Sequence, residues 1–342
     1  MHPAPSYEVG EASVLEVHDL GVLFPLKGIG FFSAKKYVHA VDNIGFQLRK
    51  GEIFCLVGES GSGKTTTALA MCGLVKQTSG RIIFQGKDIA SFNRQEARES
   101  KVKIQMIYQD PFESLPPHMT VLDIVTEPLT VNRVERDPIR RFERATKMLE
   151  EVGLTPPENF VNMFPHQLSG GQRQRVAIAS VLVLNPELIV ADEPVSMLDM
   201  SIRGGILKLM LDLKEKFGLT IVFITHDLSL VRLIGTRIAV MYLGKIVEIG
   251  SAKEVIDSPV HPYTKALASV VPRLSSAGQN KIILRGETPN AVDIPRGCRF
   301  HPRCPFLINP KICSTIAPSL IKVDTDHLVY CHFAGDIKSR NP

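Results

Sequence analysis

The most constraining feature of this sequence is a glycine-rich stretch at residues 58–65, GESGSGKT. It matches the pattern G-x-x-x-x-G-K-[ST] and stands between an apolar run at 53–57, which predicts a buried strand, and a helical pattern at 64–75. In that context the glycines let the backbone close around phosphate groups, with N–H groups and the positive end of the helix facing the anion. The residues predicted to surround a bound phosphate are Gly58, Glu59, Ser60, Gly61, Ser62, Gly63, Lys64, Thr65 and Thr66.

A phosphate-binding loop of this kind needs a metal ion and a carboxylate beside it. The usual roles place Lys64 on the β- and γ-phosphates and Thr65 on Mg²⁺. The run LIVADE at 188–193 ends a second buried strand in two acids, of which Asp192 is predicted to support Mg²⁺. Glu193 is then placed to orient or deprotonate the attacking water. Without the loop, this run would also suit a strand that ends in a solvated acidic turn.

A third motif, LSGGQ at 168–172, lies between the first two and opens an apolar helix. Its small residues and the helix N-terminus form a second candidate anion-binding site, besides the glycine-rich loop. With all three motifs, the chain resembles the ATP-binding cassette (ABC) proteins among the P-loop NTPases. The resemblance implies a head-to-tail dimer in which each LSGGQ faces the γ-phosphate held by the other subunit. The ATP contacts that it implies here are Ser169, Gly170, Gly171 and Gln172.

Three more positions match the ABC pattern. The resemblance implies that Gln109 senses Mg²⁺ and the attacking water, that Asp199 belongs to the D-loop, and that His226 contacts the γ-phosphate. Met197 departs from the alanine that is common in the D-loop. Taken alone, His226 would suit a packed or solvated histidine. Tyr37 is a candidate for stacking on adenine, and plain packing in a strand is the alternative.

The resemblance implies an α/β fold with a RecA-like core, an antiparallel β subdomain and an inserted helical lobe. The 342 residues, 44% of them hydrophobic, suffice for about two domains. We expect an ABC ATPase domain at 12–255, with the helical lobe at about 111–184, and a small metal-binding C-terminal domain at 256–342. Prolines interrupt the pattern throughout that tail, so we expect it to rely on a bound group rather than on a core of its own.

The tail also indicates a branch of the family. HPYTKAL at 261–267 and GCRFHPRC at 297–304 resemble the oligopeptide/dipeptide importer ATPases, and the cassette motifs look closest to the second, F-type, of their paired ATPases. This implies ATP hydrolysis coupled to solute import. The implied partners are a second, non-identical ATPase, two transmembrane permease subunits and an extracytoplasmic solute-binding protein. An oligosaccharide or nickel importer, and more remotely a soluble ABC ATPase in DNA or ribosome work, are the alternatives.

Four of the six cysteines crowd the tail, with the spacing C-x5-C-x8-C-x17-C. Zinc sites usually contain a closer C-x2–4-C pair, so the spacing leaves an iron–sulfur cluster, Zn²⁺ and unmetallated core cysteines open. The resemblance favours a [4Fe–4S] cluster. Its ligands would be Cys298, Cys304, Cys313 and Cys331, with His301 and His332 as possible substitutes, whereas Cys55 and Cys72 are predicted to be core residues.

Charge and hydropathy limit the partners and the cellular location expected for this chain. Lys and Arg number 40 and Asp and Glu 35, and the resulting charge of +5 requires no nucleic-acid partner. No apolar run approaches the ~20 residues of a membrane-spanning helix. The N-terminus lacks the basic and apolar regions of a secretory signal. These features predict a cytosolic chain, or one attached to a membrane only through a partner. The resemblance, with its permease partners, implies a peripheral protein on the cytoplasmic face of the cell membrane.

Overall fold

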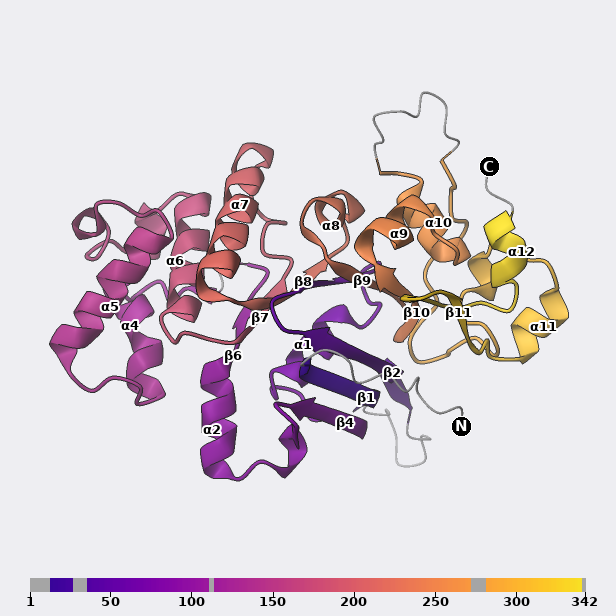
Figure 1. Cartoon of the computed structure of the whole chain (residues 1–342), viewed down its shortest axis with the longest axis horizontal. Helices are drawn as coiled ribbons and strands as arrows, with labels where there is room; N and C mark the ends of the chain where they lie inside the picture. Colours follow the sequence, from indigo (N-terminus) through magenta and orange to yellow (C-terminus); the bar gives the residue numbers. More distant parts are fainter. Residues whose placement is uncertain (1–12, 27–35, 111–113, 272–280, 340–342) are drawn as a thin grey trace. The chain divides into compact units, whose positions relative to one another are not determined.

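The computed structural model describes residues 13–26, 36–110, 114–271 and 281–339. The chain divides into two compact units. The first comprises 1–49, 53–90 and 225–342, and the second comprises 50–52 and 91–224. Figure 1 labels most elements of both. The expected domain limits at 12, 111 and 342 lie outside the described residues, and the expected boundary at 255/256 stays a prediction.

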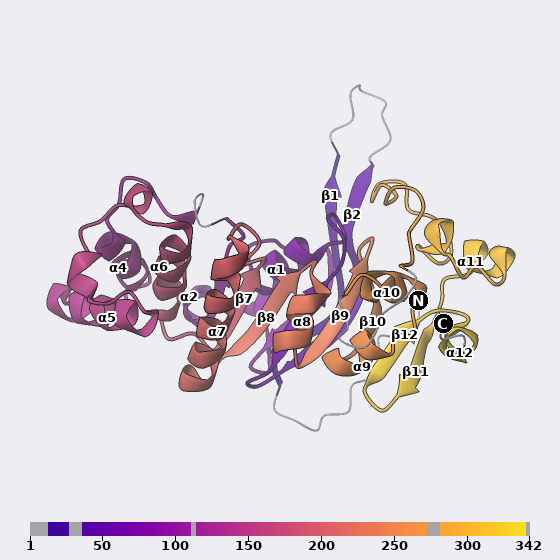
Figure 2. The same ribbon diagram turned by 90° about the horizontal axis from the view of Figure 1, so that it is seen from above.

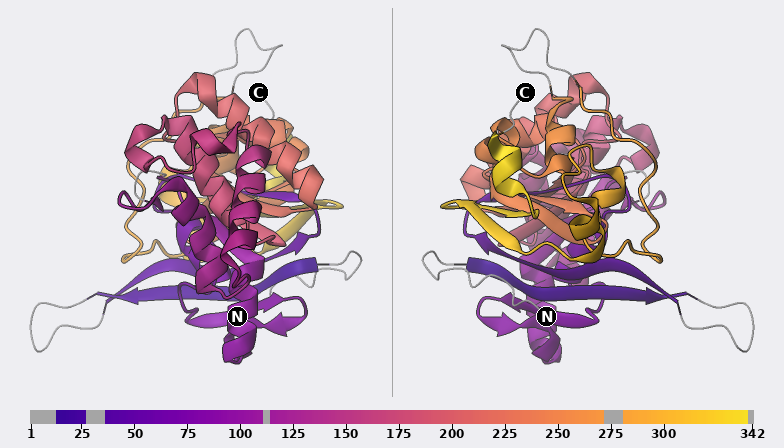
Figure 3. Two further views of the ribbon diagram at one scale, coloured as in Figure 1. Left: turned by 90° about the vertical axis from the view of Figure 1, so that its left-hand side faces the viewer. Right: turned by 90° about the vertical axis from the view of Figure 1, so that its right-hand side faces the viewer.

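The first unit opens with an antiparallel sheet of order β2-β1-β4-β5. Its strands β1 and β2 form the long ribbon visible in Figures 2 and 3. Ile44, Phe46 and Leu48 alternate with less buried residues along β2, the pattern of a sheet with one packed face. The bounds are β1 (Ser13–Pro25), β2 (Tyr37–Arg49), β4 (Ser79–Phe84) and β5 (Lys87–Asp88).

The same unit holds a second sheet around the strand that leads into the glycine-rich loop. β3 runs parallel to β9, and β9 turns back antiparallel into β10. Every residue of β3 and β9 is buried, as in parallel strands covered on both faces. The two strands thus form a hairpin around Gly244. The bounds are β3 (Ile53–Val57), β9 (Arg237–Tyr242) and β10 (Lys245–Ser251).

The helix after the loop ends earlier than the pattern at 64–75 predicts. α1 spans Lys64–Met71, with Cys72 as its C-cap. Gly73 follows with φ +67°, a left-handed conformation that glycine adopts at little cost and that commonly ends a helix. The prediction was wrong at this end because the apolar pattern continues past the glycine that stops the helix.

The tail belongs to this unit and extends its second sheet. β12 pairs antiparallel with β10, and β11 pairs with β12. The tail also packs a small core, which corrects the expectation that it has none: Val260, Val329, Cys331, Ala334 and Ile337. The remaining helices and strands of the unit are α8 (Leu228–Ile234), α9 (Ala252–Asp257), α10 (Pro262–Ala268), α11 (Pro310–Thr315), β11 (Leu320–Asp324), β12 (His327–Tyr330) and α12 (Ala334–Ser339).

A buried carboxylate joins three of these elements. Glu248 of β10 is fully buried and accepts hydrogen bonds from the backbone N–H groups of Val260 and His261, both at 2.9 Å. Its Oε1 lies 2.7 Å from Nε2 of His327 in β12. Three polar groups of the tail therefore depend on one side chain for their hydrogen bonds.

Replacing Glu248 by Ala should lower the free energy of unfolding by about 3 kcal/mol or more, because it leaves several buried polar groups without an acceptor. Thermal unfolding of the purified chain measures the effect. The matched control is Glu254→Ala on α9, where the side chain is exposed and the unfolding temperature should stay close to that of the wild type. Equal unfolding temperatures for both variants would contradict the prediction.

The second unit combines parallel strands with a group of helices. β6, β7 and β8 pair in parallel, in the order β8-β7-β6. α4, α5 and α6 contact one another and form the helical group seen in Figures 1 and 2, within the region expected for the helical lobe. The bounds are α2 (Arg94–Lys103), β6 (Ile104–Ile107), α4 (Val121–Val131), α5 (Pro138–Glu151), α6 (Gly170–Leu182), β7 (Leu188–Asp192), α7 (Met200–Phe217) and β8 (Thr220–Thr225).

Candidate functional site

The glycine-rich stretch 58–65 follows β3, and its last two residues, Lys64 and Thr65, are the first two of α1. Two of its glycines are required by close packing. A Cβ on Gly58 would lie 2.2 Å from the carbonyl oxygen of Met241, and one on Gly63 would lie 2.3 Å from that of Ala40. Gly63 also has φ +104°, which side-chain-bearing residues rarely adopt. The loop is therefore wrapped tightly against β2 and β9, as a loop that presents its backbone to an anion must be.

Lys64 is buried at the base of this loop. Its Nζ donates to the carbonyl oxygens of Gly58 and Glu59, at 2.8 and 2.9 Å. The ammonium group is thus held by the loop that surrounds it, at the start of α1. Thr65, the next residue, is exposed.

The acidic run lies in the second unit, at the end of β7. Asp192 is its last strand residue and is only 4% exposed. Glu193 follows with φ +44°, a strained conformation for this residue type that is found most often at functional sites. Nε2 of Gln109 donates to Oε2 of Glu193 at 3.3 Å. The structure therefore brings together two residues, 84 positions apart in sequence, that were both predicted to act on the attacking water.

The LSGGQ motif forms the start of α6. Ser169 is the N-cap, its Oγ accepting from the Gln172 N–H at 3.3 Å while the Gln172 side chain accepts from the Ser169 N–H at 2.9 Å. This capping box fixes the motif at the helix N-terminus, where N–H groups attract anions. A Cβ on Gly171 would lie 2.8 Å from Ile202 of α7, so only glycine fits there without a shift.

The D-loop precedes α7, and Asp199 is exposed at its N-cap. Sequence reasoning missed the residue that holds this loop, Arg203. Its Nε donates to the carbonyl oxygen of Leu198 at 2.8 Å and its Nη2 to that of Ser196 at 3.1 Å. An arginine four positions into a helix carries no local sign that it caps the preceding loop.

Two further predicted residues are accessible in the first unit. His226 is exposed after β8, and the next residue, Asp227, caps α8 by accepting from the Ser229 N–H at 2.8 Å. Tyr37 begins β2, pairs in register with Pro25 and is 38% exposed. The exposed ring of Tyr37 is available for stacking on adenine. This role, and the γ-phosphate contact expected of His226, both stay predictions.

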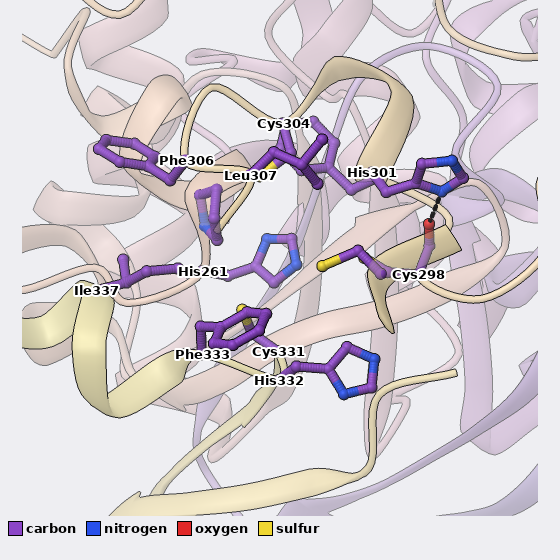
Figure 4. Close-up of a pocket in the computed structure, with 13 residues that line it drawn as sticks. His261, Cys298, His301, Cys304, Phe306, Leu307, Cys331, His332, Phe333 and Ile337 are labelled. Atoms are coloured by element: carbon purple, nitrogen blue, oxygen red, sulfur yellow. Dashed lines mark hydrogen bonds between the residues drawn. The ribbon is translucent and has the colours of Figure 1, made fainter. Parts of the chain in front are cut away.

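The four tail cysteines line one narrow pocket, together with His261, His301 and His332 (Figure 4). All four are free thiols. Burial raises the pKa of Cys304 to about 12 and that of Cys331 to about 11. Among the described residues, no group of three or more Cys, His, Asp or Glu side chains is arranged to hold a metal ion. The metal-binding character expected of the tail is therefore not shown, although four thiols around one pocket are a suitable donor set.

His261, in the HPYTKAL motif, serves a structural purpose in the same pocket. It is 1% exposed, and its Nδ1 accepts from the Tyr263 N–H at 3.1 Å to cap α10. Burial lowers the pKa of its imidazole to about 3, so the ring is neutral at physiological pH. The OH of Tyr263 in turn accepts a hydrogen bond from the backbone N–H of Glu59 at 2.8 Å, which links this motif to the glycine-rich loop.

Comparison with known families agrees with these features. Residues 41–196 match the model of the ABC transporter family, and residues 247–310 match the oligopeptide/dipeptide transporter C-terminal region. The chain is 44% identical over 327 residues to the oligopeptide transport ATP-binding protein AppF of Bacillus subtilis, covering 94% of this chain and 98% of that protein. The chain belongs to the ABC transporter ATP-binding proteins, in the oligopeptide/dipeptide family.

Solved structures of ABC ATPases share the fold of this family member. CbiO1 of Clostridium perfringens, part of the ABC transporter complex CbiONQ, has a TM-score of 0.61 at 29% identity, covering 72% of this chain and 92% of that one. A dimeric ATP-binding cassette in a post-hydrolysis state, bound to ADP and phosphate, has a TM-score of 0.60 at 30% identity, with coverage of 70% and 98%. The predicted ABC cassette fold is therefore confirmed.

Within its described residues, this ABC ATPase has no helix that is both long enough and apolar enough to span a bilayer.

Proposed function

We propose that this protein is the ATP-hydrolysing subunit that energises a binding-protein-dependent ABC importer for oligopeptides or dipeptides. The observation that carries the proposal is the tightly wrapped glycine-rich loop with Lys64 held at its base, in a chain that also has the C-terminal region of the oligopeptide/dipeptide family. The relative AppF, named as an oligopeptide transport protein, supports peptide as the solute.

Each motif residue receives one role in ATP hydrolysis. Lys64 binds the β- and γ-phosphates, and Thr65 and Asp192 hold Mg²⁺. Glu193 deprotonates the attacking water, and Gln109, which already donates a hydrogen bond to it, orients both. The remaining contacts that we propose for ATP are His226, Tyr37, Asp199 and the backbone and side chains of the GESGSGKT and LSGGQ motifs.

The capped LSGGQ helix is proposed to act on the ATP of a second ATPase subunit, because its N–H groups and Ser169 suit a γ-phosphate. ATP binding then closes the two subunits and hydrolysis reopens them, which switches two permease subunits between inward- and outward-facing states. We propose that the second ATPase is a different chain, that a solute-binding protein delivers the peptide, and that the complex holds this subunit at the cytoplasmic face of the membrane.

Reconstituted transport tests this function. The complete importer is placed in proteoliposomes, and ATP hydrolysis is measured with the binding protein empty, loaded with a peptide, loaded with an oligosaccharide and loaded with a nickel chelate. Stimulation by the peptide-loaded form, with uptake of labelled peptide, supports the proposal. Stimulation by only the oligosaccharide or nickel form would keep the motor role and reject peptide as the solute.

We propose further that Cys298, Cys304, Cys313 and Cys331 hold a [4Fe–4S] cluster, with Zn²⁺ as the alternative. The support is their shared pocket, in which none of the four is joined in a disulfide. Thiolate ligands suit either metal group, and a bound group would cross-link four segments of the tail.

Anaerobically purified protein should therefore contain about four iron and four sulfide per chain and show a broad visible absorbance band. Cys304→Ser should lose this iron and lower the unfolding temperature, whereas Cys72→Ser, in the cassette, should keep it. Colourless protein with stoichiometric zinc would reject the cluster and retain the metal site. Protein with neither metal would reject both.

A further inference from the structure

The glycine-rich loop has a charged partner in the tail that no motif predicts. The carboxylate of Glu59, the second residue of the loop, accepts from Nη1 and Nη2 of Arg303 at 2.8 and 3.4 Å. It also accepts from Oγ1 of Thr288 at 2.6 Å. Arg303 directly precedes Cys304, so the ion pair joins the cysteine segment to the loop across 244 positions of sequence.

Arg303 is itself firmly placed. Its side chain is 9% exposed, its Nη1 donates to Thr288 at 3.2 Å, and its guanidinium lies 5.9 Å from the ring centre of Tyr242. A guanidinium that contacts both oxygens of a carboxylate fixes the orientation of the carboxylate and also neutralises its charge. Because this pair is partly buried, loss of the arginine would leave the carboxylate without its compensating charge in a site that is only partly open to water.

A second contact links the same tail segment to the loop. Arg299, next to Cys298, donates to the carbonyl oxygen of Leu243 and to Asp42. Gly244, the residue after Leu243, donates its N–H to the carbonyl oxygen of Ser62 in the glycine-rich loop at 2.9 Å. Residues 298–304 therefore hold the loop at two points, one through Glu59 and one through the β9–β10 turn.

We propose that Arg303 is a positioning residue for nucleotide binding, and that residues 298–304 act as a brace for the glycine-rich loop. The inference rests on the proposed function, since it assumes that this loop binds ATP. Its physical basis is the carboxylate of Glu59, which lies in a loop that must receive highly charged phosphates. Arg303 neutralises that carboxylate and holds it toward the tail, so it does not repel the incoming anion.

Titration of the chain with Mg²⁺ and ATP by calorimetry tests the brace. Arg303→Met should raise the Kd for ATP by about tenfold, within the usual range of coupling between sites. Glu59→Gln removes the repelling charge and leaves the Arg303 guanidinium in place, so it should change the Kd much less. The double variant E59Q/R303M should then bind ATP better than R303M alone, because no free carboxylate remains. A purely structural role for Arg303 would give no such rescue.

Two controls keep the test decisive. Arg296→Met removes an exposed arginine from the same tail segment and should leave the Kd unchanged. If R303M does not fold, Arg303→Lys keeps the charge without the forked contact and should raise the Kd by a smaller factor. An unchanged Kd in the foldable Arg303 variant, or an increase that E59Q does not relieve, would overturn the brace. Wild-type protein that fails to bind ATP would instead overturn the proposed function.

Discussion

Glu193→Gln is expected to lower ATP turnover by about 10²- to 10⁴-fold, the usual contribution of a general base. The substitution keeps the size of the side chain and an oxygen that can accept the hydrogen bond from Gln109, so the local geometry should persist. It removes only the ability to take a proton from water. The measurement is steady-state phosphate release by the subunit assembled with its ATPase partner.

The same variant should still bind ATP, and it should accumulate as a closed dimer because hydrolysis no longer reopens the subunits. Size-exclusion chromatography with ATP and Mg²⁺ detects this species. Glu187→Gln is the matched control: it lies at the opposite end of the same strand, where its carboxylate is 3.0 Å from Lys103. That variant should turn over ATP normally. Near-normal turnover in E193Q would show that Glu193 is not the base.

Lys64→Met is expected to abolish productive ATP binding, the second large effect. The ammonium group is buried in the loop, and its removal takes away the positive charge that the phosphates require. At an ATP concentration of about 100 times Kd, binding should stabilise the wild type by about 2.7 kcal/mol. The variant should lose that ligand-dependent stabilisation, which a thermal unfolding series in ATP and Mg²⁺ measures.

Lys76→Met serves as the control for this experiment, since it removes an exposed lysine shortly after α1. It should retain the full stabilisation by ATP. K64M protein that is stabilised by ATP as strongly as the wild type would contradict the role given to this lysine. Lower unfolding temperatures without ATP would indicate damage to the fold, which the ligand-dependent difference separates from lost binding.

The motifs could be read from the sequence because each is local. In the glycine-rich loop, the glycine spacing, the flanking apolar strand and the following helix all lie within about twenty residues, so short-range geometry determines their shape. The buried strands β3 and β7 were predicted for the same reason, as short apolar runs with clear boundaries. The end of α1 was missed because one glycine outweighed an apolar pattern that continued beyond it.

The other features of the fold and the site depend on contacts between residues that are far apart in the sequence. Neither the pairing of β12 with β10 nor the hold of Arg203 on the D-loop leaves a periodic signal in the chain. The sequence alone determined the family, the phosphate-binding loop and the candidate catalytic residues, because these depend on residue type and spacing. Only the tertiary structure placed Arg303 on Glu59 and gathered four cysteines around one pocket, because such contacts form between residues that folding, rather than sequence, makes neighbours.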